Sequence, residues 1–161
     1  MGISQPKNVV IQGWPETRQV LWKPAVAGQP LLKIADCEAL TVSNFAFSGA
    51  GKSQSLVEIR GACPGLVLTQ SSAAAFAKRA VLLSGCTGLV TLNRLRIVEK
   101  GAAGVAVLSD GDTACRDVVI EGCRFEGPLN PAIDLGADAD ATVRDCRFHQ
   151  NAAAIELEDS P

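Results

Sequence analysis

The sequence predicts an all-β fold, a right-handed parallel β-helix of about six short rungs. Three observations lead to this fold: a recurring apolar pattern, a second alternating pattern that follows each copy, and turn residues between them. The patterns are typical of short strands, and the turn residues indicate connections between strands. Parallel crossover connections are almost always right-handed, which sets the expected sense of the coil.

The first pattern places apolar side chains at offsets 0, 2, 5 and 7, most clearly in residues 40–47. The copies, beginning with a divergent first one, are Val9, Ile11 and Trp14; Leu40, Val42, Phe45 and Phe47; Leu66, Leu68, Ser71 and Ala73; Val90, Leu92, Leu95 and Ile97; Val118, Ile120, Cys123 and Phe125; and Ala141, Val143, Cys146 and Phe148. From Leu40 onward the copies start 26, 24, 28 and 23 residues apart. Such spacing is typical of a solenoid with one repeat per turn.

The second pattern is a pair of apolar residues with one residue between them, a period of two that indicates a strand with one buried face. The pairs are Leu32 and Ile34, Val57 and Ile59, Val81 and Leu83, Val105 and Val107, Ile133 and Leu135, and Ile155 and Leu157. Together the two patterns give two or three short strands per repeat. Successive repeats are then expected to stack about 4.8 Å apart.

We expect a single domain over residues 1–161. Residues 1–31 form an N-terminal cap and the first rung, residues 32–158 form the repeating rungs, and residues 159–161 form a tail. Only Ser71–Arg79 has a helical composition, and a loop excursion fits it equally well.

The predicted cap contains both tryptophans, Trp14 and Trp22, together with Pro15, Pro24 and Pro30. A solenoid exposes a strand edge at each end, and a segment folded across that edge protects it from pairing. We therefore expect this stretch to cross the first rung.

Composition excludes several classes of partner. The net charge is −2 and aromatic residues are 4% of the chain, so the basic footprint expected for nucleic-acid binding is missing. No apolar run approaches the roughly 20 residues of a membrane span. The N-terminus lacks the apolar segment of a signal peptide, so the expected location is the cytoplasm or unknown.

The six cysteines follow the repeat. One ladder is expected from Cys37, Cys63 and Cys86, and a second from Cys123 and Cys146. Stacked inside a solenoid, reduced cysteines act as small apolar residues, although a disulfide between neighbouring rungs is the alternative. Cys115 lies outside both ladders, and we expect it to be exposed.

Several segments resemble a known class of fold. Residues 39–49, 116–128 and 141–157 look like repeats of the right-handed parallel β-helices of the pectate-lyase-like superfold. The chain is more particularly similar to accessory β-helix regions of bacterial multidomain proteins such as Ser/Thr protein kinases. No kinase motif occurs in the sequence, so the resemblance implies an accessory domain.

Acidic residues follow two of the second-pattern strands, as Asp110 and Asp112 and, one rung later, Asp138 and Asp140. Four neighbouring carboxylates would bind Ca²⁺ or raise the pKa of one of them for general acid catalysis. The alternative is polar turn residues. The one histidine, His149, ends a predicted strand and is either a solvated turn residue or a general acid or base.

The position between offsets 5 and 7 should face outward, and three consecutive rungs place Arg96, Arg124 and Arg147 there. We call these three residues the arginine ladder. A positive stripe of this kind could hold a sulfate, a phosphate or an acidic glycan. The alternative is internal pairing with neighbouring acidic residues, namely Glu99, Glu121, Glu126 and Asp145.

The position between offsets 0 and 2 should also face outward. Its residues, the β-branched ladder, are Val10, Thr41, Val67, Thr91, Val119 and Thr142. They carry no charge, so another subunit or a neighbouring domain could cover them. Strand propensity alone would also explain β-branched residues at these positions.

Two functions follow from these observations. The first is a non-catalytic scaffold or recognition module that mediates oligomerisation or binds a partner or a glycan, as an accessory domain of a larger signalling protein. The second is a lyase or hydrolase that acts on an acidic polysaccharide, which rests on fold analogy together with the aspartates and the arginine ladder. The sequence favours the module, with no cofactor other than possible Ca²⁺.

Overall fold

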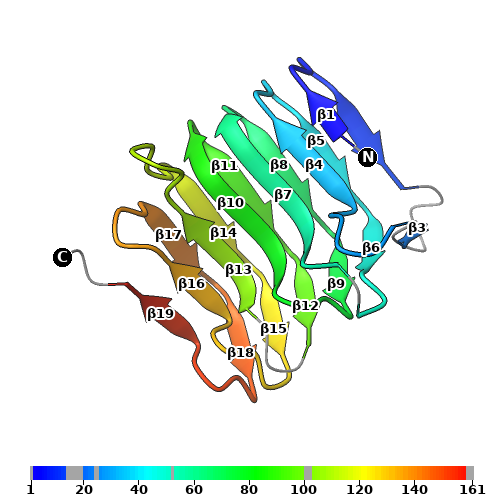
Figure 1. Cartoon of the computed structure of the whole chain (residues 1–161), viewed down its shortest axis with the longest axis vertical. Helices are drawn as coiled ribbons and strands as arrows, with labels where there is room; N and C mark the ends of the chain where they lie inside the picture. The colour runs from blue at the N-terminus through cyan, green and yellow to red at the C-terminus, as the bar shows by residue number, and fades with distance from the viewer. Residues whose placement is uncertain (1, 14–19, 24–25, 52, 100–102, 159–161) are drawn as a thin grey trace.

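The computed structural model describes residues 2–13, 20–23, 26–51, 53–99 and 103–158. These residues form strands and connections and no helix, which confirms the all-β prediction. Within this part of the chain, no helix is long and apolar enough to cross a membrane. The strands pair in parallel into three sheets, and within each sheet the strands stack one after another along the molecule, as Figure 1 shows.

Each turn of the coil contributes one strand to each sheet. Sheet 1 contains β2 (Val10–Gln12), β5 (Thr41–Ser43), β8 (Leu66–Thr69), β11 (Val90–Asn93), β14 (Val118–Glu121) and β17 (Ala141–Arg144). Sheet 2 contains β3 (Val20–Trp22), β6 (Phe45–Ser48), β9 (Ser72–Ala74), β12 (Arg96–Val98), β15 (Arg124–Glu126) and β18 (Arg147–His149). Sheet 3 contains β1 (Gly2–Ser4), β4 (Leu32–Ala35), β7 (Ser55–Ala62), β10 (Arg79–Thr87), β13 (Ala103–Leu108), β16 (Ile133–Leu135) and β19 (Ile155–Leu157). The result is the expected parallel β-solenoid, in which the six stacked strands of sheets 1 and 2 are separated by about five turns of the coil.

The first sequence pattern proves to be two strands joined by a corner. Between offsets 2 and 5 the chain turns from sheet 1 into sheet 2, and a single residue at the corner has a positive φ. These corner residues are Asn44, Gln70, Arg94, Gly122 and Asp145, with φ between 49° and 63°. The left-handed conformation reverses the alternation of side chains, so the apolar positions on both sides of the corner point inward.

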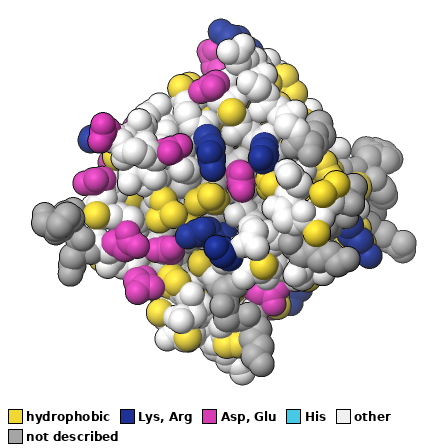
Figure 2. Space-filling view, viewed as in Figure 1, with side chains coloured by type: hydrophobic (Ala, Val, Ile, Leu, Met, Phe, Trp, Pro, Cys, Tyr) yellow, Lys and Arg dark blue, Asp and Glu magenta, His cyan; other side chains and the backbone are white. Residues whose placement is uncertain are grey.

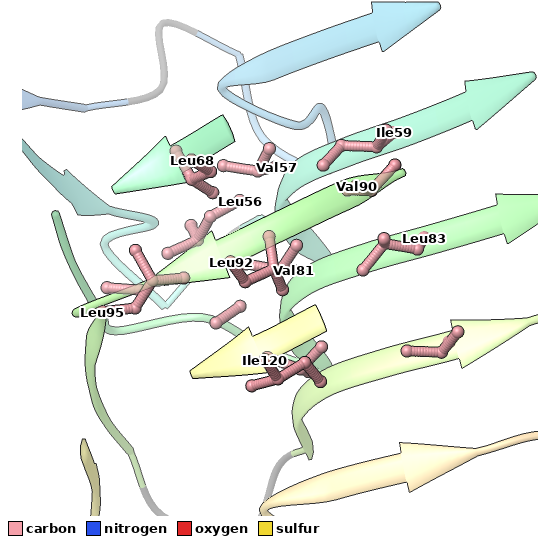
Figure 3. Close-up of a cluster of buried hydrophobic side chains, with 14 of the residues drawn as sticks. Leu56, Val57, Ile59, Leu68, Val81, Leu83, Val90, Leu92, Leu95 and Ile120 are labelled. Atoms are coloured by element: carbon pink, nitrogen blue, oxygen red, sulfur yellow. The ribbon is translucent and has the colours of Figure 1, made fainter. Parts of the chain in front are cut away.

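The core lies between the sheets and runs the length of the coil. In the middle rungs the inward residues are almost fully buried; Leu66, Leu92 and Ile120, for example, expose none of their surface. Figure 3 shows side chains of sheet 1, such as Leu68 and Leu92, packed against Val57 and Val81 of sheet 3. Close packing of such residues contributes most of the stability of a solenoid.

The second sequence pattern is confirmed in register. Ile34 pairs with Ile59, which pairs with Leu83, and the column continues through Val107 and Leu135.

The segment Ser71–Arg79 is neither a helix nor only a loop, because Ser72–Ala74 form strand β9. Its Ser71, at an apolar position of the pattern, is buried, and its hydroxyl donates to the Thr69 carbonyl at 2.9 Å.

The first rung corrects the sequence frame. Val20 pairs with Phe45 and Trp22 with Phe47, so β3 takes the place that was expected for Trp14. Trp22 therefore belongs to the coil, and its ring lies 5.4 Å from that of Phe45. Of the expected cap, Trp14, Pro15 and Pro24 lie outside the described residues.

The cysteines form a longer ladder than expected, and the prediction for Cys115 was wrong. All six thiols are free, and Cys115 is fully buried. The Cys86 N–H donates to its Sγ at 3.1 Å, and the Arg116 N–H, next along the chain, donates to the Cys86 carbonyl. Cys115 therefore continues the column of Cys37, Cys63 and Cys86.

Candidate functional site

The arginine ladder lies on the outer face of sheet 2. Arg96 pairs with Arg124, which pairs with Arg147, so the three side chains stand in register on β12, β15 and β18. All three residues are exposed. Strands in a sheet are about 4.8 Å apart, so the ladder spans about 10 Å.

Only one member of the ladder forms an ion pair among the described residues. The Arg96 guanidinium donates to the Glu126 carboxylate, with Nη2 at 2.7 Å and Nε at 3.2 Å. This hydrogen bond lowers the pKa of Glu126 and raises that of Arg96. Arg124 and Arg147 have no carboxylate within salt-bridge distance in that part of the chain, so the internal pairing considered from the sequence accounts for Arg96 alone.

His149 lies beside this ladder. It ends β18, is exposed, and pairs in register with Glu126 of the preceding rung. Arg96 and Arg124 are the main causes of the lowered pKa of Glu126, and His149 adds to them. Asp145, which the sequence offered as a partner for the arginine ladder, occupies the corner between sheets 1 and 2. A protonated His149 would add to the positive charge of the face.

The β-branched ladder is also in register, on the outer face of sheet 1. Its pairing runs from Val10 through Thr41, Val67, Thr91, Val119 and Thr142. Val10 at one end is 66% exposed, and the four central residues are half-buried. The ladder is therefore a narrow, uncharged strip open to contact along its length.

A hydrogen-bonded column runs next to this strip, and sequence reasoning missed it. The Thr69 hydroxyl donates to Asn93, the Asn93 amide donates to Glu121, and Arg144 donates to Glu121 with Nε at 2.8 Å. Both donors lower the pKa of Glu121. These residues all stand two positions after the β-branched ladder on their strands, a spacing that could have revealed the column.

The four aspartates lie in turns after sheet 3. Asp110 and Thr113 exchange backbone hydrogen bonds at 2.9 and 3.1 Å and close a tight turn that includes Asp112. The Asp140 N–H donates to the Cys115 carbonyl. Among the described residues, no three or more His, Cys, Asp or Glu side chains gather as a metal site requires. Calcium binding by Asp110, Asp112, Asp138 and Asp140 stays a prediction.

The fold defines the class of the protein, a parallel β-solenoid with three sheets. No protein-family model matches this chain, and neither a curated protein nor a solved structure does. The side chains on the outer faces of the coil are therefore the features that indicate a function.

Proposed function

We propose that this β-solenoid is a non-catalytic recognition module that binds an acidic glycan across the outer face of sheet 2. The observation that carries this proposal is the register of the arginine ladder, in which Arg124 and Arg147 lie on adjacent strands without a carboxylate partner among the described residues. Like charges on neighbouring strands repel, and a bound anion relieves that repulsion.

The chemistry of arginine suits such a ligand. Guanidinium groups bind carboxylate and sulfate groups through paired N–H donors, and they do not lose their charge at any physiological pH. An extended polymer with repeated anionic groups could bind several rungs at once, which would raise its affinity without any new type of contact.

The test is retention on immobilised heparin and polygalacturonate at low salt. We expect Arg124→Gln with Arg147→Gln to abolish retention, while Arg60→Gln, an exposed arginine on sheet 3, should leave it unchanged. A far-ultraviolet circular dichroism spectrum checks that the coil is intact. Retention that persists in the double variant would overturn the proposal, and release of unsaturated products from polygalacturonate would favour the alternative, a polysaccharide lyase.

A second candidate function is self-association or packing against a neighbouring domain through the β-branched ladder. It is favoured by the six uncharged residues in one unbroken column on sheet 1. Under either function, the likeness of the repeats to the pectate-lyase-like superfold and to accessory regions of bacterial protein kinases supports a role within a larger protein. Light scattering on a size-exclusion column tests this candidate, because a Thr91→Lys variant should convert an oligomer into a monomer.

A further inference from the structure

A second polar site lies on another side of the coil, where sheet 3 begins. It is a surface groove of about 270 Å³, lined by Ala77, Lys78, Arg79, Ala103, Asn130, Pro131 and Asp134. Its residues come from three consecutive rungs, at the starts of β10, β13 and β16. Figure 2 shows this face of the molecule, where basic and acidic side chains flank a central apolar area.

Small residues make room for the arginine in this groove. Arg79 is the first residue of β10 and pairs with Ala103 in the next rung. The rung after that places Pro131 beside Gly104, whose N–H donates to the Pro131 carbonyl. Among the described residues, these neighbours in the two following rungs are therefore small: alanine, glycine and proline.

The Arg79 side chain lacks an acceptor for one of its donors among the described residues. Its Nε is buried and has no hydrogen-bond partner in that part of the chain, and no described carboxylate forms an ion pair with the side chain. A buried donor of this kind costs free energy unless a ligand or water accepts from it. An anion in the groove would supply the missing acceptor.

The opposite wall supplies an acceptor. Asp134 of β16 is half-buried, and burial together with the nearby Glu158 raises its pKa, while the charge of Arg79 opposes that shift. The charge of Arg79 therefore acts on Asp134, but the two side chains do not form an ion pair. Lys78 and Asn130 are exposed at its rim. The groove therefore offers donors on one side and a carboxylate on the other.

We infer that this groove binds a small hydroxylated oxyanion, with Arg79 and Lys78 on the anionic group and Asp134 accepting a hydrogen bond from a ligand hydroxyl. This site is separate from the arginine ladder, which lies on sheet 2. It distinguishes ligands by their hydroxyl groups as well as by charge. Inorganic phosphate presents the anionic group without an alcohol hydroxyl, whereas glycerol phosphate presents both groups.

The experiment is a proton–nitrogen NMR titration of the full chain with each of these two probes. We expect glycerol phosphate to shift the backbone amides of Arg79, Ala103 and Asp134, and to bind more tightly than inorganic phosphate. Arg79→Gln should weaken binding by about tenfold or more, because a charge-assisted hydrogen bond is lost. Arg116→Gln, an exposed arginine outside the groove, is the matched control.

Two further variants keep the inference falsifiable. Lys78→Gln changes an exposed side chain and should also weaken both probes, even if Arg79→Gln fails to fold. Asp134→Ala should remove the advantage of glycerol phosphate over inorganic phosphate. The inference is overturned if neither probe shifts these amides, if the shifts are confined to Arg96, Arg124 and Arg147, or if all three groove variants bind as the control does.

Discussion

The rung of β14, β15 and β16 and the rung of β17, β18 and β19 have the same sequence pattern and very different burial. Ile133 and Leu135 are 0% and 7% exposed, whereas their register partners Ile155 and Leu157 are 43% and 70% exposed. Among the described residues, the earlier rung has a neighbour on both sides and the later rung has one. The alternation of residues thus sets the direction of a side chain, but its burial depends on the rungs above and below.

Phenylalanine gives the closest comparison between the two rungs. Phe125 and Phe148 pair in register and stack, with ring centroids 5.2 Å apart and planes 7° apart. Phe125 exposes none of its surface, while Phe148 is only partly buried. The two residues share chemistry and strand position, so a difference between them reports the effect of the second neighbouring rung.

The largest effect we expect is on stability. Phe125→Ala should lower the free energy of unfolding by about 3–5 kcal/mol, because it leaves a cavity that two rungs enclose. Phe148→Ala should cost about half as much, because its site is already partly open to water. Urea unfolding followed by circular dichroism measures both. Equal losses would show that burial does not differ between the rungs.

The next effect is on thiol reactivity. Cys146 is half-buried and Cys123 is fully buried, although they occupy the same position in the repeat. Burial raises the pKa of both thiols, that of Cys123 to about 12. We expect iodoacetamide to alkylate Cys146 about 100-fold faster in the native protein, because Cys123 needs an opening of the coil. Peptide mass spectrometry measures the alkylation rates, with Cys146→Ser as the control. Comparable rates would show that the coil protects the two thiols equally.

The smallest effect is on pH dependence. The pKa of Glu121 lies below its ordinary value of 4.5, first because Arg144 of the later rung donates to it. The ion pair therefore stabilises the fold above about pH 4.5, and this contribution disappears as the pH falls through the lower pKa of the folded state. Arg144→Gln should make the hydrogen exchange of residues 141–157 faster near neutral pH. The difference in exchange rate between the variant and the wild type should shrink under acid. A difference that grew would contradict a stabilising ion pair between Arg144 and Glu121.

Much of the fold could be predicted because the repeat is strict. The columns of Ile34 and Ile59, of Thr41 and Val67, and of Arg124 and Arg147 all follow from spacing alone. The apolar residues of the two patterns alternate with a period of two, and from β5 onward one left-handed residue resets that period at the corner between sheets 1 and 2.

Irregular connections explain the errors. Cys115 was misplaced because the turn closed by Asp110 and Thr113 lengthens the chain after β13. Counted backwards from the next strand, Cys115 lies three residues before Val118, as Cys37 does before Leu40. The groove at Arg79 was beyond sequence analysis for another reason. It depends on small residues in two later rungs, which no local pattern connects to an arginine.

The one-residue corner between sheets 1 and 2 has a consequence for how this protein could vary. Because each copy from Leu40 onward turns at a single left-handed residue, an insertion there would turn the following apolar side chains away from the core. The connections from sheet 2 to sheet 3 and from sheet 3 to sheet 1 both differ in length from rung to rung, so we expect these two edges to accept additions. New loops grafted there would keep the columns on sheets 1 and 2 in step, and the corner between sheets 1 and 2 is the edge whose length is fixed.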